Sequence, residues 1–295
     1  MPDTVAAAID GWLAQLRARQ LSPHTLAAYG RDLGKLQVWM HEEAIERFDQ
    51  LDADRLRGLV AREHRAGLSP ASLQRLLCAC RGLFRHLVRE GRLQGDPAAG
   101  LRAPRRQRRL PEVLDADEAR ALVELPANGA LARRDRAMLE LFYSSGLRLA
   151  ELVGLRWGDV DLDDGQARVL GKGRKTRIVP IGRHAREALR ALAADGAAPD
   201  QPVFRGRGGA PLSPRSVQLR LKQAALKSGL PRNVYPHLLR HSCASHLLES
   251  SGELRAVQEL LGHADIATTQ IYTHLDFQHL AKVYDAAHPR ARRKG

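Results

Sequence analysis

The sequence predicts a mainly α-helical protein with two domains: an N-terminal four-helix domain, and a mixed α/β domain that combines helices with a small antiparallel sheet. Three observations predict this arrangement. Apolar residues in the first hundred positions recur at intervals of three and four, which is typical of helices with one buried face. A run of arginines between two prolines follows. Beyond that run, strand-like segments separated by glycines and aspartates interrupt the helical pattern.

The composition is that of a folded and strongly basic protein. Its 295 residues are enough for two domains, each with its own core. The 47 Lys and Arg residues outnumber the 33 Asp and Glu, so the formal net charge is +14, and a hydrophobic content of 44% excludes a disordered polycation. Such a charge predicts a polyanionic partner, and nucleic acid is the most common partner of this kind.

The cysteines and the apolar stretches predict a cytoplasmic protein. Cys78, Cys80 and Cys243 form neither a disulfide framework nor a C-x-x-C zinc pair, and we expect them to be small buried residues in a reducing compartment. No apolar stretch approaches the roughly 20 residues of a membrane span. The first eight residues contain an acid and no basic group, which argues against a signal peptide.

The N-terminal domain, residues 1–100, is expected to contain four helices. A Leu-Ser-Pro sequence at 21–23 predicts a helix start, because serine caps free amides and proline fits the first helical position. The same sequence recurs at 68–70, and a third copy at 212–214 predicts a helix start in the second domain. The four expected helices are Val5–Ala18, a helix from Pro23 through Met40, Leu51–His64 and a helix from Pro70 through Phe84.

Residues 101–112 are expected to form a basic linker. Its prolines bracket a run of arginines with almost no apolar residue, and such a segment can follow a phosphate backbone. The alternative is a solvated hinge that contacts nothing. Two domains joined by a basic linker lead to the hypothesis of a clamp around a DNA duplex.

The second domain, residues 113–295, changes its pattern part-way along. Helical periodicity predicts helices at 117–124 and 131–143, and another that starts near Leu147. Strand-like runs then occupy 160–162, 166–170 and 176–181, so the turn between the last two presents Lys172. Helices resume at Arg183, and the apolar face of the last one predicts a C-terminal helix that docks on a partner subunit or packs on its own domain.

Six residues of this domain are candidates for catalysis, although each also has an ordinary structural explanation. Arg148 can pair with Glu151 on a helix surface, and Lys172 can be an exposed turn residue. Together the six supply what phosphoryl transfer through a tyrosine requires: a nucleophile, cations for the phosphate oxygens, and proton donors and acceptors. The candidates are Arg148, Lys172, His237, Arg240, His263 and Tyr272.

The order and spacing of these six residues resemble the catalytic motif of the tyrosine recombinase (phage integrase) family. His237 and Arg240 form the pattern His-x-x-Arg, and nine positions separate His263 from Tyr272 (272 minus 263). The resemblance extends over the whole chain, because the N-terminal helices are similar to the family's core-binding domain. Leu238 departs from the pattern at a position where relatives often have lysine.

The resemblance implies a role for each candidate. Tyr272 would attack a DNA phosphate and form a 3′-phosphotyrosyl link. Arg148 and Arg240 would hold the non-bridging oxygens, and Lys172 would protonate the 5′ leaving oxygen. His237 would accept the tyrosine proton, and His263 would donate a hydrogen bond to the phosphate. No metal, cofactor or ATP is implied.

The resemblance also implies partners and leaves alternatives open. The substrate would be double-stranded DNA with two half-sites, one bound by a paralogous recombinase, and a DNA translocase would activate the complex. An integrase of a mobile element and a type IB topoisomerase share the chemistry. A zinc hydrolase would use His237 and His241, although the cationic Arg240 lies between them. A non-catalytic DNA-binding regulator would not require Tyr272.

Overall fold

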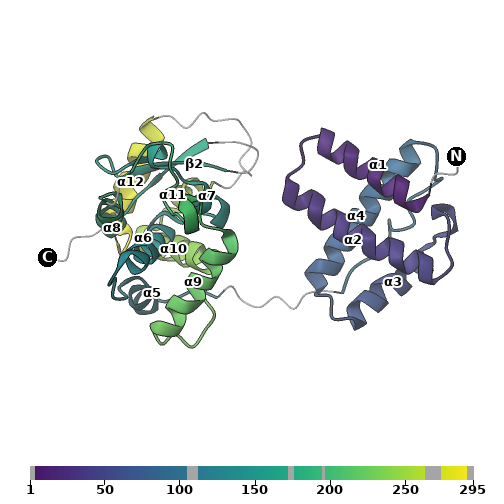
Figure 1. Cartoon of the computed structure of the whole chain (residues 1–295), viewed down its shortest axis with the longest axis horizontal. Coiled ribbons are helices and arrows are strands. Elements are labelled where there is room, and N and C mark those ends of the chain that lie inside the picture. The colour runs from purple at the N-terminus through teal and green to yellow at the C-terminus, as the bar shows by residue number, and fades with distance from the viewer. Residues whose placement is uncertain (1–3, 105–111, 172–175, 195–196, 263–273, 291–295) are drawn as a thin grey trace. The chain divides into compact units, whose positions relative to one another are not determined.

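In a computed structural model, the chain divides into two compact units, residues 1–110 and 111–295 (Figure 1). The structure describes residues 4–104, 112–171, 176–194, 197–262 and 274–290, with no side-chain description for 274–279. None of the helices in these ranges is long and apolar enough to cross a membrane.

The first unit has four α-helices and one short 3-10 helix, η1, in its described part. The two helices of this unit that follow a Leu-Ser-Pro sequence begin as expected: Ser22 accepts a hydrogen bond from the Thr25 amide, and Ser69 accepts one from the Ser72 amide. The elements are α1 (Val5–Ala18), α2 (Pro23–Glu42), η1 (Phe48–Gln50), α3 (Ala53–Arg65) and α4 (Pro70–Arg89).

Helices α2 and α4 carry most of the core of this unit. Two ion pairs tie the helices together from the side: Asp32 on α2 with Arg75 on α4, and Lys35 on α2 with Glu63 on α3. The expectation that all three cysteines are buried is wrong for Cys78, which is exposed. Cys78 and Cys80 lie two positions apart, so a helix directs them to opposite faces.

The second unit contains the sheet and the remaining helices. The third Leu-Ser-Pro sequence of the chain lies in this unit and also starts a helix, where the Ser213 hydroxyl accepts a hydrogen bond from the Ser216 amide. Its elements are α5 (Ala116–Val123), α6 (Ala130–Ser145), α7 (Leu149–Gly154), η2 (Trp157–Asp159), β1 (Val160–Asp161), β2 (Gln166–Leu170), β3 (Thr176–Pro180), α8 (Arg183–Ala193), η4 (Arg207–Gly209), α9 (Pro214–Lys227), α10 (Pro236–Ser251), α11 (Leu254–Leu261) and α12 (His274–Ala287).

The three strands form the predicted antiparallel sheet in the order β1-β2-β3. Ala167 and Val169 of β2 are buried, and they pair with Val179 and Arg177 of β3. Because paired residues share a face of the sheet, Arg177 points into the domain at a position where an apolar residue is usual. Ile178, between the two, points outward and is partly exposed.

Helices α6 and α10 pack against each other in the core of the second unit, and α11 and α12 pack on α10 (Figure 1). The predicted helix near Leu147 begins two residues later, because Arg148 is the N-cap of α7 and Gly146 ends α6 in the left-handed conformation, with φ of 55°. This short turn brings Arg148 to the end of α6.

The close approach of α1 and α4 generates a stability prediction. A Cβ at Gly82 would lie 2.4 Å from Cζ2 of Trp12. We expect Gly82→Ala to lower the free energy of unfolding by about 1–3 kcal/mol, because forced displacement of the indole outweighs the better helix propensity of alanine. Thermal unfolding measures the change.

The matched control is Gly34→Ala on α2, where a Cβ would meet nothing within 4 Å. This variant should be stabilised by about 0.5–1 kcal/mol through helix propensity alone. Equal effects of the two substitutions would contradict a specific Trp12 contact.

Candidate active site

The turn between α6 and α7 positions the first predicted catalytic residue. Gly146 adopts the left-handed conformation, and a Cβ there would lie 3.4 Å from the Cys243 sulfur of α10. The Ser145 hydroxyl donates a 2.6 Å hydrogen bond to the Pro180 carbonyl at the end of β3. The turn is therefore held by α10 on one side and by the sheet on the other, and the Arg148 backbone is fixed.

Helix α10 carries two further predicted residues on one face. Pro236 occupies its first turn, followed by His237, and Arg240 lies about one turn later. The His237 ring is exposed, whereas only 8% of Arg240 is exposed. The Arg240 guanidinium donates from Nη1 to the Gly146 carbonyl, which joins α10 to the turn that carries Arg148.

The two predicted arginines meet at the C-terminus of α11. Nη2 of Arg148 donates to the Leu261 carbonyl at 3.2 Å and to the Gly262 carbonyl at 3.4 Å. Nη2 of Arg240 also donates to the Leu261 carbonyl. The last carbonyls of a helix lack partners within the helix and carry a partial negative charge, so cations at this end are favoured. The structure thus brings Arg148 and Arg240 together around one backbone oxygen.

Two further charged residues complete this cluster, and the sequence analysis did not identify them as functional. Nη1 and Nη2 of Arg177 donate to the two carboxylate oxygens of Glu151 at 2.6 Å and 3.0 Å, and both side chains are buried. Nε of Arg177 donates to the Leu260 carbonyl at 3.3 Å. Glu151 also accepts from Nη1 of Arg148 at 2.9 Å, as its ordinary structural explanation predicted. We call Arg148, Glu151, Arg177 and Arg240 the arginine cluster.

The arginine cluster contains three guanidinium groups and one carboxylate. Burial lowers the pKa of Arg240 to about 10, and the positive charges of Arg148 and Arg177 act in the same direction. Burial would raise the pKa of Glu151, but hydrogen bonds from Arg177 and Arg148 outweigh it and bring the value to about 2. Glu151 is therefore ionised, and the four groups together retain two positive charges. Such a cluster is suited to bind an oxyanion.

Three predicted site residues, Lys172, His263 and Tyr272, lie outside the described residues. The residues directly before Lys172 and His263 are described. Lys172 falls between β2 and β3, and Arg177 is the second residue of β3. His263 directly follows Gly262, whose carbonyl accepts from Arg148. Lys172 is therefore close in sequence to Arg177 of the arginine cluster, and His263 follows a residue that Arg148 contacts.

The C-terminal helix α12 packs on its own unit in this structure. Leu280, Tyr284 and the following His288 are buried, and the Tyr284 and His288 rings stack with centroids 4.7 Å apart. Gly182 provides the space for Tyr284, because a Cβ there would lie 2.7 Å from the phenol oxygen. The predicted docking of this helix on a partner subunit stays a prediction.

Beyond α12, Arg290 is also anchored in the second unit. Its Nη1 donates to Glu124 at 2.8 Å and its Nε to Glu140 at 3.1 Å. Glu140 is fully buried, and burial raises its pKa despite this partner. The segment that contains Tyr272 is thus bounded by two anchors, the arginine cluster before it and the α12–Arg290 packing after it.

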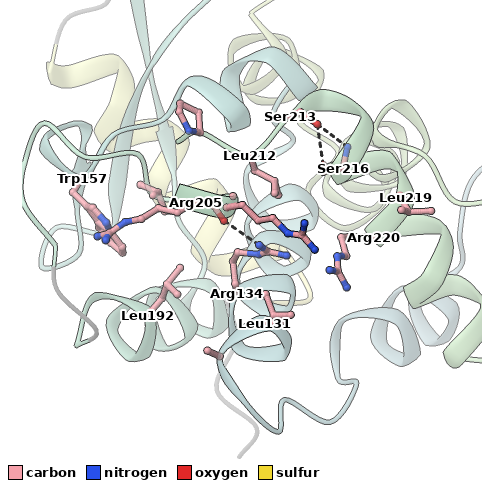
Figure 2. Close-up of a pocket in the computed structure, with 15 residues that line it drawn as sticks. Leu131, Arg134, Trp157, Leu192, Arg205, Leu212, Ser213, Ser216, Leu219 and Arg220 are labelled. Carbon is pink, nitrogen blue, oxygen red and sulfur yellow. Dashed lines mark hydrogen bonds between the residues drawn. The ribbon is translucent and has the colours of Figure 1, made fainter. Parts of the chain in front are cut away.

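A cavity of about 690 Å³ lies at the opposite end of α6 from Arg148. Figure 2 shows the guanidinium groups of Arg134, Arg205 and Arg220 gathered at its centre, with Nη1 of Arg134 donating to the Arg205 carbonyl at 3.0 Å. Arg134 and Arg148 are 14 positions apart, which corresponds to roughly 20 Å along a helix. The cavity is therefore separate from the arginine cluster, and the described members of the predicted set, Arg148, His237 and Arg240, do not line it.

Metal-binding side chains do not gather in the described part of the chain, where no group of three or more His, Cys, Asp and Glu residues could hold an ion. His237 and His241, the pair considered for zinc, are both exposed on α10. The arginine cluster is cationic, and such a cluster recognises phosphate by hydrogen bonds from its guanidinium groups.

Comparison with known proteins agrees with this geometry. Residues 112–279 match the model of the phage integrase family, and residues 9–91 match that of the phage integrase N-terminal SAM-like domain. The chain belongs to the phage integrase family. It is 60% identical over 294 residues to the tyrosine recombinase XerC of Xanthomonas campestris pv. campestris (strain B100), covering 99% of this chain and 91% of that protein. XerC of Xylella fastidiosa (strain 9a5c) is 59% identical, covering 97% and 98% respectively.

The enzyme class follows from this membership: the chain is a XerC-like tyrosine recombinase, a site-specific DNA recombinase. Solved structures of low identity share its fold. A lambda integrase dimer bound to a COC′ core site has a TM-score of 0.72 at 20% identity, covering 91% of this chain and 99% of that chain. XerH bound to its difH substrate has a TM-score of 0.68 at 24% identity, covering 92% and 82%.

The buried His288 generates a pH prediction for the second anchor. Burial, with a contribution from His246, lowers the pKa of His288 to about 3 from the ordinary value of 6.5, and the neighbouring Arg290 and the rings of Tyr143 and Tyr284 complete its surroundings. The folded pKa lies below the unfolded one, so this contribution to stability is present above pH 6.5 and is lost as the pH falls towards 3.

We therefore expect this one group to lower the free energy of unfolding by about 2 kcal/mol between pH 7 and pH 5. His288→Asn keeps an acceptor near the Arg290 amide but does not titrate, so its unfolding should depend less on pH over this interval. Thermal unfolding of both proteins at several pH values measures the difference. The same pH dependence in both would contradict the assignment.

Proposed function

We propose that this chain cuts and rejoins DNA through Tyr272, at a site whose phosphate is held by Arg148 and Arg240. The observation that carries the proposal is the convergence of the two arginines on the Leu261 carbonyl, directly before the segment that contains His263 and Tyr272. Each guanidinium has five N–H donors. Arg240 makes two of the hydrogen bonds described above and Arg148 makes three, so donors remain on both for the oxygens of a phosphate.

In the proposed reaction, the Tyr272 oxygen attacks a DNA phosphorus and forms a 3′-phosphotyrosyl bond, while the bond to the 5′ oxygen breaks. Lys172 gives a proton to that leaving oxygen, and His237 receives the proton of the phenol. His263 donates a hydrogen bond to the phosphate. The positive charges of Arg148 and Arg240 stabilise the oxyanion that develops in the transition state. Because the phosphotyrosyl link keeps the energy of the phosphodiester, rejoining needs no metal and no ATP.

The proposed substrate is a dif-type site in double-stranded DNA with two half-sites. A XerD-type recombinase binds the second half-site in a heterotetramer, and the FtsK translocase activates the complex; the biological result is the resolution of chromosome dimers. The full-length similarity to proteins named XerC supports this assignment over an integrase of a mobile element. The similarity of the fold to DNA-bound XerH and to a DNA-bound lambda integrase dimer supports duplex DNA as the ligand and assembly into multimers.

The nucleophile is tested with a labelled dif-type duplex that is nicked near the cleavage point, in EDTA and with a XerD-type protein present. The nick lets the short product diffuse away, so the covalent complex accumulates. We expect a protein–DNA adduct that survives detergent with the natural chain and none with Tyr272→Phe. Tyr29→Phe, in the N-terminal unit, is the matched control and should form the adduct normally.

An adduct that persists without Tyr272 would overturn the mechanism. An adduct that forms on the attachment site of a mobile element, and not on a dif-type site, would overturn the proposed substrate and favour the integrase alternative. Equal adduct formation with and without the XerD-type protein would overturn the proposal that a XerD-type recombinase is the partner.

The role of the arginines is tested with Arg240→Lys. Lysine keeps the charge but cannot donate to the Gly146 and Leu261 carbonyls and to phosphate from one planar group. We expect adduct formation to fall about 100-fold or more, with DNA affinity changed by less than about tenfold, because most phosphate contacts lie elsewhere on the duplex. Gel shift and single-turnover cleavage on the same duplex measure the two quantities, and unchanged cleavage would contradict the role.

A further inference from the structure

Arg177 is more buried than Arg148, and it is the arginine of the cluster that holds Glu151 with two side-chain nitrogens. Only 5% of its surface is exposed, compared with 33% for the Arg148 side chain. Its three nitrogens donate to the two oxygens of Glu151 and to the Leu260 carbonyl. Its donors are directed at protein groups, and a phosphate that reaches Arg148 does not need Arg177 as a ligand.

Arg177 and its two partners lie on three elements, and each of these elements borders a residue of the proposed reaction. Arg177 itself lies on β3, which begins shortly after Lys172 in the sequence. Glu151 lies on α7, which begins directly after Arg148. Leu260 lies at the end of α11, which precedes His263. One buried side chain therefore joins the supports of three residues that must act on the same phosphate.

We propose that Arg177 is a positioning residue for strand cleavage, which orients Arg148 through Glu151 and fixes the end of α11 through the Leu260 carbonyl. The inference rests on the proposed function. A buried ion pair is a poor source of stability compared with apolar packing of the same volume. A geometric role explains why a charged side chain occupies this inward position of the sheet, because small displacements of catalytic groups have large effects on rate.

Gly262 provides an independent way to disturb the same contact. Its φ is 60°, and a Cβ there would lie 2.9 Å from Cδ and 3.1 Å from Nε of Arg177. The residue after α11 must therefore be small as well as left-handed, since a side chain would push Arg177 away from Glu151 and Leu260. Gly262→Ala should produce the same kind of defect as a change of Arg177 itself.

The test uses the full chain and the nicked dif-type duplex described above. We expect Arg177→Lys to form the covalent adduct 10- to 100-fold more slowly, with DNA affinity within threefold of the natural chain. Gly262→Ala should be slowed similarly. The double variant should be slower than either single variant by much less than the product of the two factors, because both act through one contact. The matched control is Arg190→Lys on α8, which alters an exposed ion pair between Arg190 and Asp163. It should change neither the rate of adduct formation nor the DNA affinity.

A pH profile separates positioning from a merely structural role. Glu151 faces Arg148 and Arg177, with Arg240 nearby, and Arg177 contributes most to keeping it ionised. When lysine replaces the bidentate partner, adduct formation should fall more steeply between pH 7 and pH 5 than in the natural chain. Circular dichroism at each pH confirms that the variants remain folded.

Each other outcome has a defined meaning. A natural chain that forms no Tyr272-dependent adduct refutes the proposed function. A natural chain that forms it while folded Arg177→Lys forms it at the same rate refutes the positioning role alone. Cleavage that falls only in proportion to the folded fraction, or to DNA binding, also refutes positioning.

Discussion

The second unit depends on a single electrostatic constraint: three guanidinium groups must be held within hydrogen-bonding distance of the same helix end. Like charges at this range repel, and burial of Arg240 adds a desolvation cost. Glu151 and the carbonyls of Leu260, Leu261 and Gly262 offset part of this cost. The remaining positive charge is the reason why the site can bind an anion, and it also explains why so much of the local backbone serves to hold arginines.

The fold supplies the elements that meet this constraint. The left-handed turn at Gly146 places its own carbonyl on Arg240 and leads directly into Arg148. The sheet contributes Arg177 from its inner face, and α10 contributes Arg240 from the core of the unit. Because these elements come from separate parts of the chain, the arginine cluster depends on the packing of the whole unit and not on one local motif.

The sequence predicted the parts of this arrangement that depend on local patterns. All three Leu-Ser-Pro sequences start helices, since capping by serine is decided by neighbouring residues. The sheet and the shared helix face of His237 and Arg240 could also be predicted, because strand-like runs and helical spacing are local patterns too. The family motif identified Arg148 and Arg240, although their meeting point at Leu261 was not predictable.

Arg177 shows where such prediction ends. In the segment 176–181, alternation alone would place Ile178 inward and Arg177 in solvent. The structure has the opposite orientation, because Glu151 and the end of α11 offer partners to an inward arginine. The only local signal is the pairing of β3 with the buried Ala167 and Val169, and it requires the strand register to be known. Cys78 was wrongly expected to be buried because its helix face could not be read from residue type.

The anchoring of Arg290 has a consequence for how the protein is made. Glu140 lies in the middle of the catalytic unit, yet its cationic partner is 150 residues further along the chain. During synthesis, α6 leaves the ribosome long before Arg290 does, and until then this carboxylate has no partner from the C-terminal segment. The final packing of the unit can therefore form only after Arg290 has left the ribosome. A polypeptide that stops before Arg290 can contain the whole arginine cluster but lacks the ion pairs with Glu124 and Glu140.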